Sequence, residues 1–281
     1  MNWEHASFDD KDRISSIKAQ LHHVLQSCSA FGRHYLPASE EDENAVISWV
    51  PEEKIMVGKW VESESGLVRP GLDISSKTLI FQRENAETSS LDIQGNSFAQ
   101  LMMWLEGQAG ESGLSVDKFS ADLPYELPKY DTQKGSPFLL EDDEALEALL
   151  SLYHNAFLLC SNLRGKFSNV SEVRIWPHHF DLAISVKLKE SGNADTSTYL
   201  GIGFSPGDDH YDEPYFYTNS WPFADDALLR DLSNGHWHID DWVGGVLTLN
   251  ELVEIKEGLQ EEKVFGFYES STSQLSSIIL Q

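Results

Sequence analysis

Residues 141–188 read EDDEALEALLSLYHNAFLLCSNLRGKFSNVSEVRIWPHHFDLAISVKL and contain a complete passage from helix to sheet. Apolar side chains recur every three or four residues from Leu146 to Cys160, which is the spacing of one buried helix face. The acidic residues at 141–144 suit the positive N-terminal end of that helix. Val173 to Trp176 and Phe180 to Lys189 then have the pattern of paired strands. The stretch therefore predicts a long amphipathic helix followed by a sheet.

The same order of features occurs earlier in the chain. Each copy has a helix ending in Cys-Ser, a tryptophan, an apolar run, a Pro-Gly turn and a second helical pattern. The markers stand at Cys28, Trp49, Pro70-Gly71 and about Ser97 in the first copy, and at Cys160, Trp176, Pro206-Gly207 and about Thr248 in the second. An internal repeat of this kind predicts that the chain folds into two similar units. Few residues are identical, so two unrelated units that look alike are the alternative.

Turns interrupt every apolar run, and no β-α-β alternation is visible, which favours antiparallel sheets. We therefore expect an α+β protein of two pseudo-symmetric lobes from an internal duplication, each an antiparallel sheet with packed helices. The proline- and glycine-containing segment 122–137 marks the join. The expected lobes are residues 1–128 and residues 129–281, the second carrying the candidate site.

The chain is strongly acidic. Its 46 acidic and 20 basic residues give a net charge of −26, which repels polyanions. We therefore expect neither nucleic-acid nor membrane partners, because phosphate contacts need clustered Lys and Arg. The N-terminus lacks the apolar core of a signal peptide, and no apolar run is long enough for a membrane span. With two cysteines, which we expect to be buried free thiols, these features predict a cytoplasmic protein.

Polar chemistry concentrates in three stretches of the second half: WPHHFD (176–181), SPGDDHYDEPYFY (205–217) and GHWHIDDW (235–242). His236 and His238 alternate around Trp237, so in a strand both would point to one face. Imidazoles beside a carboxylate suit Zn, Fe or Mn. The candidate metal ligands are His178, His179, His210, Glu213, His236 and His238. The alternative is that these residues face solvent or cap turns, since no H-E-x-x-H pattern is present.

Aromatic residues in the same stretches predict a ligand cleft. Aromatic walls with a few polar groups are typical of small-molecule sites. The candidate ligand-binding residues are Trp176, Asp181, Tyr215, Tyr217 and Trp237. Ordinary sheet packing is the alternative for the aromatic residues.

Asp181 interrupts an apolar strand, and alternation places it on the face opposite Leu182. A carboxylate there needs a hydrogen-bonding or cationic partner to offset desolvation. In the alternative interpretation, Asp181 accepts backbone or tryptophan N–H bonds and fixes a turn.

Three short motifs of the second half follow one another: F-D-L-A at 180–183, P-G at 206–207 and P-Y-F-Y at 214–217. In this order they resemble an uncharacterised bacterial protein family, a domain of unknown function. The family has no assigned activity, so the resemblance implies an arrangement of elements and not a reaction. His178-His179 stand where small residues are expected, which argues against a family-wide active site at these two histidines.

Two functions remain open from the sequence. The first is a small-molecule-binding module for a neutral or cationic ligand, with its His/aromatic cleft in the second lobe. The second is a metal-dependent hydrolase or oxygenase that uses the same histidines. Whether the chain is an enzyme stays undecided. Nucleophilic catalysis has little support, because Ser205 lacks a G-x-S-x-G elbow. The adjacent carboxylates Asp240 and Asp241 would point oppositely in a strand and cannot act as a catalytic dyad.

Overall fold

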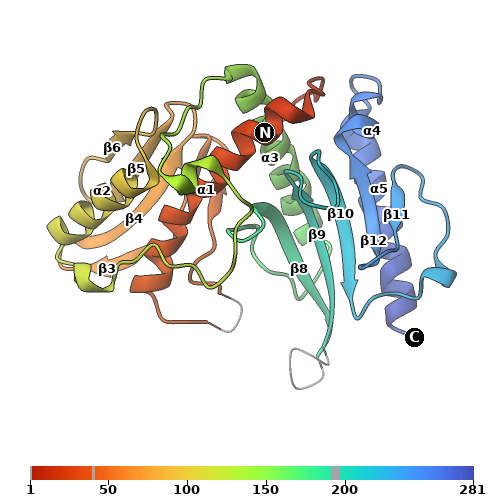
Figure 1. Cartoon of the computed structure of the whole chain (residues 1–281). Helices are drawn as coiled ribbons and strands as arrows, with labels where there is room; N and C mark the ends of the chain where they lie inside the picture. The colour runs from red at the N-terminus through yellow and green to blue at the C-terminus, as the bar shows by residue number, and fades with distance from the viewer. Residues whose placement is uncertain (1, 40–41, 191–196) are drawn as a thin grey trace. The chain divides into compact units, whose positions relative to one another are not determined.

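A computed structural model describes residues 2–39, 42–190 and 197–281 of the chain (Figure 1). The chain forms two compact units. Unit 1 comprises Met1–Ser15, Glu147–Val173 and Asp181–Gln281, and unit 2 comprises Ser16–Leu146 and Arg174–Phe180. Both contain helices and antiparallel strands, so the predicted α+β class and antiparallel pairing are confirmed. These units do not coincide with a division at residues 128 and 129.

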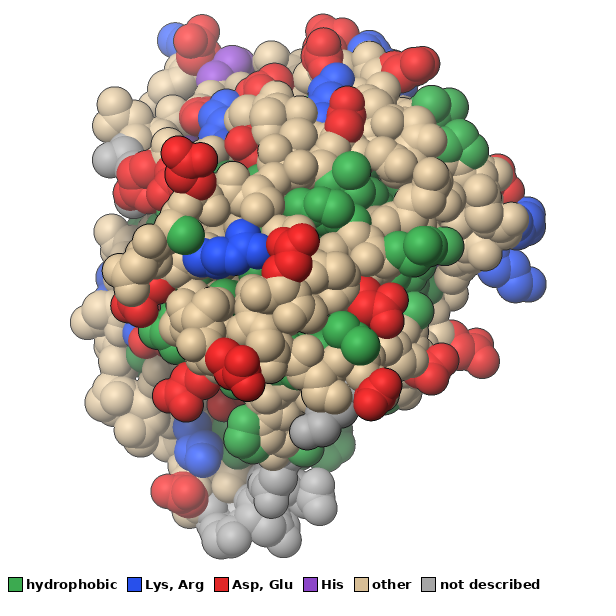
Figure 2. Space-filling model, turned by 90° about the vertical axis from the view of Figure 1, so that its left-hand side faces the viewer, with side chains coloured by type: hydrophobic (Ala, Val, Ile, Leu, Met, Phe, Trp, Pro, Cys, Tyr) green, Lys and Arg blue, Asp and Glu red, His purple; other side chains and the backbone are tan. Residues whose placement is uncertain are grey.

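Unit 2 is built around a meander. Its strands are β1 (Ser48–Val50), β2 (Ile55–Val57), β3 (Val61–Ser63), β4 (Gly66–Asp73), β5 (Thr78–Arg83) and β6 (Ser89–Asp92). The sheet order is β1-β2-β4-β5-β6, with β3 also paired to β4. Figure 2 views the side where α2 and β6 lie in Figure 1, and acidic side chains are spread over it among apolar ones.

Helix α1 (Lys11–Tyr35) extends from unit 1 into unit 2. Its apolar residues from Ile14 to Phe31 recur every three or four positions and are buried, because residues at that spacing share one helix face. Helix α2 (Phe98–Glu111) begins at Ser97, which forms a capping box with Gln100. The short 3-10 helices η1 (Val116–Lys118) and η2 (Asp131–Lys134) follow.

The expected turn at Pro70-Gly71 is wrong, because both residues lie inside β4. Along one side of β4, residues 66–68 pair with β3 and residues 71–73 pair with β2. Pro70 stands between these two pairings, where its missing N–H costs little. On the other side it faces Phe81 of β5.

Unit 1 holds the second sheet, in the order β11-β12-β10-β9-β8-β7. The elements of this half are α3 (Asp143–Arg164), β7 (Arg174–Trp176), β8 (Asp181–Lys189), β9 (Thr198–Ser205), β10 (Tyr215–Trp221), η4 (Asp226–Leu228), β11 (His236–His238), β12 (Gly244–Thr248), α4 (Leu249–Val253) and α5 (Gln260–Ile279). Thr248 caps α4 in a capping box with Glu251.

The two faces of this sheet differ. Phe204 and Phe216 lie on the apolar face, where their rings contact Tyr153 of α3 and Tyr268 of α5. The opposite face, which we call the polar face, carries the alternate residues of each strand. Its members include Asp181, Ala183 and Ser185 of β8, Gly201, Gly203 and Ser205 of β9, Tyr215, Tyr217 and Asn219 of β10, Gly244, Val246 and Thr248 of β12, and His236 and His238 of β11. Within the described residues, no helix combines the length and apolar character needed to cross a bilayer.

Candidate metal centre

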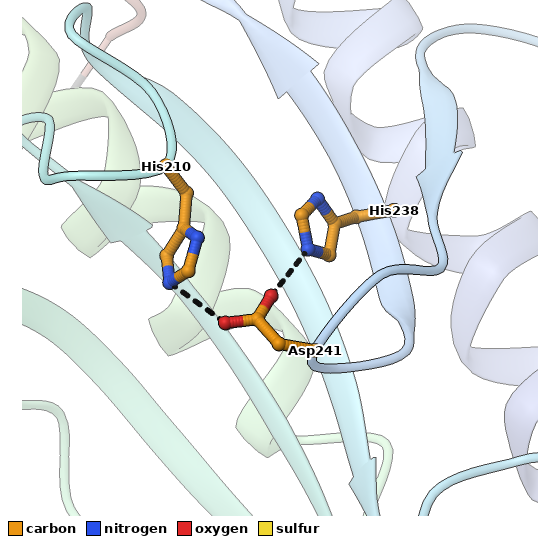
Figure 3. Close-up of side chains that lie close together, drawn as sticks. All are labelled: His210, His238 and Asp241. Carbon is orange, nitrogen blue, oxygen red and sulfur yellow. Dashed lines mark hydrogen bonds and ion pairs between the residues drawn. The ribbon is translucent and has the colours of Figure 1, made fainter.

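Three potential metal ligands meet in unit 1: His210, His238 and Asp241 (Figure 3). One donor atom of each lies within 4.8 Å of the other two. The Nε2 atom of His238 lies 3.1 Å from Oδ1 of Asp241, and Nε2 of His210 lies 3.5 Å from Oδ2. The carboxylate therefore lies between the two imidazole rings.

The connection from β9 to β10 presents His210. Asp208 accepts the backbone N–H groups of His210 and Tyr211, which makes a tight turn. Its second oxygen accepts the hydroxyl of Tyr215 at 2.5 Å, which fastens this turn to the strand. Gly207 enters the turn with φ of +102°, a conformation that favours glycine. The sequence P-G-D-D-H thus holds His210 by local hydrogen bonds.

His238 ends the short strand β11, where it faces Gly244 of β12. The ring of Trp242 stacks on the imidazole at 4.4 Å between centroids. A Cβ at position 244 would meet the Trp242 ring at 2.4 Å, so the glycine leaves room for this stack. With its side chain 9% exposed, His238 is the most enclosed of the three ligands.

Tyr211 joins the two histidines of β11. Its hydroxyl lies 3.1 Å from Nδ1 of His238 and 3.3 Å from Nε2 of His236. The other nitrogen of His236 lies 3.2 Å from Glu251, and this hydrogen bond raises the pKa of His236. Because Tyr211 occupies Nδ1 of His238, the Nε2 atom remains to face Asp241. A hydrogen bond to one ring nitrogen is the usual means of orienting a ligating histidine.

The arrangement is suited to a transition-metal ion. The hydrogen bond from His238 lowers the pKa of Asp241, which therefore is a carboxylate at neutral pH. Donors that each bind one ion at about 2.1 Å lie about 3.0 to 3.4 Å apart. The separations of 3.1 and 3.5 Å join the two imidazoles to different oxygens of the carboxylate. One donor atom of each residue lies within 4.8 Å of the other two, so small side-chain rotations would bring three donors into that range. Two imidazoles and one carboxylate suit zinc, iron or manganese and leave coordination positions for another molecule.

The other predicted ligands have different surroundings. Among the described residues, His178, His179, Glu213 and His236 belong to no group of three or more potential ligands. His178 and His179 are part of unit 2, with their ring centroids 4.3 Å apart. Burial lowers the pKa of His178 to about 4. Glu213 accepts the backbone N–H and the side-chain amide of Asn250.

The predicted ligand-binding residues are held by specific hydrogen bonds. On the polar face the Tyr217 hydroxyl donates to Asp181 at 2.5 Å. Tyr217 reaches it across Gly203, where a Cβ would meet the tyrosine ring at 2.9 Å. The indole N–H of Trp237 donates to the Arg230 carbonyl at 2.7 Å. Trp176 belongs to unit 2, where its ring contacts His178.

Side chains alternate between the two faces along β10. Tyr215 and Tyr217 share the polar face, whereas Phe216 packs on the apolar face. Asp181 likewise lies opposite Leu182, as predicted.

Asp241 was not expected as a ligand. The sequence argued against Asp240-Asp241 as a catalytic dyad, and the informative spacing is the three residues from His238 to Asp241. That spacing brings the two side chains together because the chain turns directly after β11.

No family model, curated protein or solved structure matches the chain. The resemblance to a bacterial family therefore stays a prediction, and functional inference rests on the geometry of the site.

Proposed function

We propose that unit 1 is a binding module whose ligand is a divalent transition-metal ion, held by His210, His238 and Asp241. The separation of the carboxylate from the two imidazoles carries this proposal. The metal is the cationic ligand that so acidic a chain favours. Its remaining coordination positions would accept a small neutral molecule beside the aromatic residues of the polar face.

A metal-dependent oxygenase or hydrolase is the second candidate. Two histidines and one carboxylate form the ligand set of non-haem iron oxygenases, and a bound zinc ion activates water in hydrolases. The side chains of His210 and Asp241 are 41% and 62% exposed. Oxygenase chemistry needs reactive intermediates shielded from water, so this exposure favours binding over oxygenase catalysis.

The test begins with elemental analysis of protein purified without a histidine tag, followed by titration calorimetry with Zn²⁺. We expect one ion per chain, and a rise in melting temperature that a chelator removes. His238→Ala and Asp241→Asn should each weaken zinc binding more than about 100-fold. Removing a residue that only hydrogen-bonds to a metal ligand already lowers metal affinity about 10- to 100-fold. His154→Ala, on α3 of the same unit, is the matched control.

The outcomes separate the alternatives. Unchanged affinity in both ligand variants would overturn the proposal, and loss of binding in His178→Ala/His179→Ala would transfer the site to the other predicted histidines. Turnover of an ester or of an organic substrate with O₂ by the iron- or zinc-loaded protein would favour the enzyme.

We also infer that the two halves arose by duplication. Support comes from the shared order of a helix, antiparallel strands and further helices in α1 to α2 and in α3 to α5. Cys28 and Cys160, which stand at matching places, are both free and buried, and this also supports a cytoplasmic protein. Superposing residues 14–110 on residues 141–257 tests the idea. Elements that fail to match in order and direction would overturn it.

A further inference from the structure

Exposed apolar side chains gather in the segment that joins β10 to β12. Trp221, Phe223, Leu228 and Ile239 are each between 46% and 53% exposed. We call these four residues the edge patch. Single exposed apolar residues are ordinary, but exposed aromatic residues in contact with each other are typical of interaction surfaces. The rings of Trp221 and Phe223 are in edge contact at 5.8 Å, so these two form one surface.

Strand register places the patch at one end of the unit 1 sheet. Asn219, Gly244 and His238 face one another across β10, β12 and β11. Trp221 is the last residue of β10 and pairs with Tyr199 of β9, two residues past the pairing of Asn219 with Gly244. Ile239 directly follows His238, so both residues lie past the end of β12. Leu228 ends η4 on the connection that runs from this end to β11 (Figure 1).

Hydrogen bonds fasten the segment to the rest of unit 1. The Trp237 indole donates to the Arg230 carbonyl, and the Arg230 backbone N–H donates to Gln274 of α5 at 2.8 Å. At the other end, Ser220 donates to the Pro222 carbonyl at 3.0 Å. An anchored surface loses less conformational entropy when a partner docks than a loose loop does. The edge patch is therefore already organised for binding.

Charge decides which partner fits. Residues 221–242 contain five aspartates and one arginine, and all five aspartates are exposed. A second copy of this chain, with its own net charge of −26, would be repelled, as would an anionic membrane or a nucleic acid. A complementary surface has Lys and Arg around an apolar side chain, since complementary potentials guide association and reject wrong partners.

We propose that the edge patch docks a basic protein, with Trp221 and Phe223 receiving an apolar side chain and the surrounding aspartates pairing with its lysines or arginines. Apart from Asp241, which is a proposed metal ligand, these aspartates take no part in the candidate metal site. Aromatic residues at the centre of an interface contribute most of the binding energy, and a charged rim adds specificity and association rate.

The test uses two synthetic peptides with equal numbers of lysines, one an amphipathic Leu/Lys helix and the other polylysine. We expect the amphipathic peptide to bind the full chain more tightly by fluorescence anisotropy, with affinity falling as salt rises. The variant Trp221→Ala/Phe223→Ala should bind at least about tenfold more weakly. Met103→Ala, another exposed apolar residue, is the matched control and should bind like the wild type.

Charge is tested separately with Asp225→Asn/Asp226→Asn, against Glu52→Gln/Glu257→Gln as a control of equal charge change. The first pair should weaken binding more and flatten its salt dependence. Equal binding of both peptides, insensitive to the aromatic variant, would overturn the proposal, and so would the absence of binding. A dimer in analytical ultracentrifugation that the aromatic variant abolishes would assign the patch to a second copy instead. Thermal unfolding of each variant shows whether the fold is intact.

Discussion

His22 of α1 offers a quantitative test of burial in unit 2. Its ring is buried, with Nε2 2.8 Å from the Pro177 carbonyl and Nδ1 2.8 Å from the Tyr130 hydroxyl. A carbonyl only accepts, so Nε2 carries the proton and the tyrosine donates to Nδ1. This neutral tautomer is satisfied on both sides. Burial lowers the pKa of His22 to about 4 from its ordinary 6.5.

The direction of the pH effect follows from proton uptake. Between pH 6.5 and pH 4 the unfolded chain protonates His22 while the folded chain does not, so acidification favours unfolding. The stability that comes from keeping His22 neutral is fully present above its ordinary pKa of 6.5. It is lost as the pH falls toward its folded-state pKa of about 4. Relative to pH 7, the two pKa values give a loss of about 2 kcal/mol at pH 5 and about 3 kcal/mol at pH 4.

The measurement is urea unfolding of the wild type and His22→Gln at pH 7, 5 and 4. A glutamine amide can donate to Pro177 and accept from Tyr130, but it does not titrate in this range. The variant should therefore lose about 3 kcal/mol less than the wild type between pH 7 and pH 4. Parallel pH curves for the two proteins would refute the reasoning. The control His154→Gln should follow the wild-type curve.

Three further predictions concern single side chains. Tyr217→Phe removes the hydroxyl that donates to Asp181. The free energy of unfolding, measured in urea, should therefore fall by about 1.5 to 3 kcal/mol. Gly203→Ala places a methyl group against the Tyr217 ring and should destabilise by about 1 to 3 kcal/mol. Its control, Gly107→Ala in α2, meets nothing within 4 Å and should stabilise by about 0.5 to 1 kcal/mol. Burial raises the pKa of both cysteine thiols to about 12, so a disulfide reagent should label neither in the native protein and both after unfolding.

The spacing of apolar residues along the sequence is enough to predict helices and strands that bury one face. The buried stripe of α1 repeats every three or four residues, and the alternation of Tyr215, Phe216 and Tyr217 reports the two faces of β10. Pro70 shows where this reasoning stops. A proline inside a strand is tolerated there because the neighbouring strand changes from β3 to β2, and this pairing depends on residues distant in the sequence.

The candidate site divides in the same way. Placing His236 and His238 on one face needed only the alternation of a strand, and both do contact Tyr211. Finding Asp241 required the turn after β11 and the folding back of the connection that carries His210. His236 contacts Glu251, which belongs to a different element, α4. The local spacing of His236 and His238 therefore does not reveal that the two histidines have different carboxylate partners.

The interleaving of the two units sets an order for folding during synthesis. All residues of unit 2 have been made once Phe180 leaves the ribosome. The N-terminal segment must wait longer, because Ala6 exchanges hydrogen bonds with Gln260, 254 positions later. At about 5 to 20 residues per second, the delay is about 10 to 50 seconds. The segment around Ala6 should therefore find its native partner late, although it is translated long before Gln260, which leaves it open to chaperones and proteases in the interval.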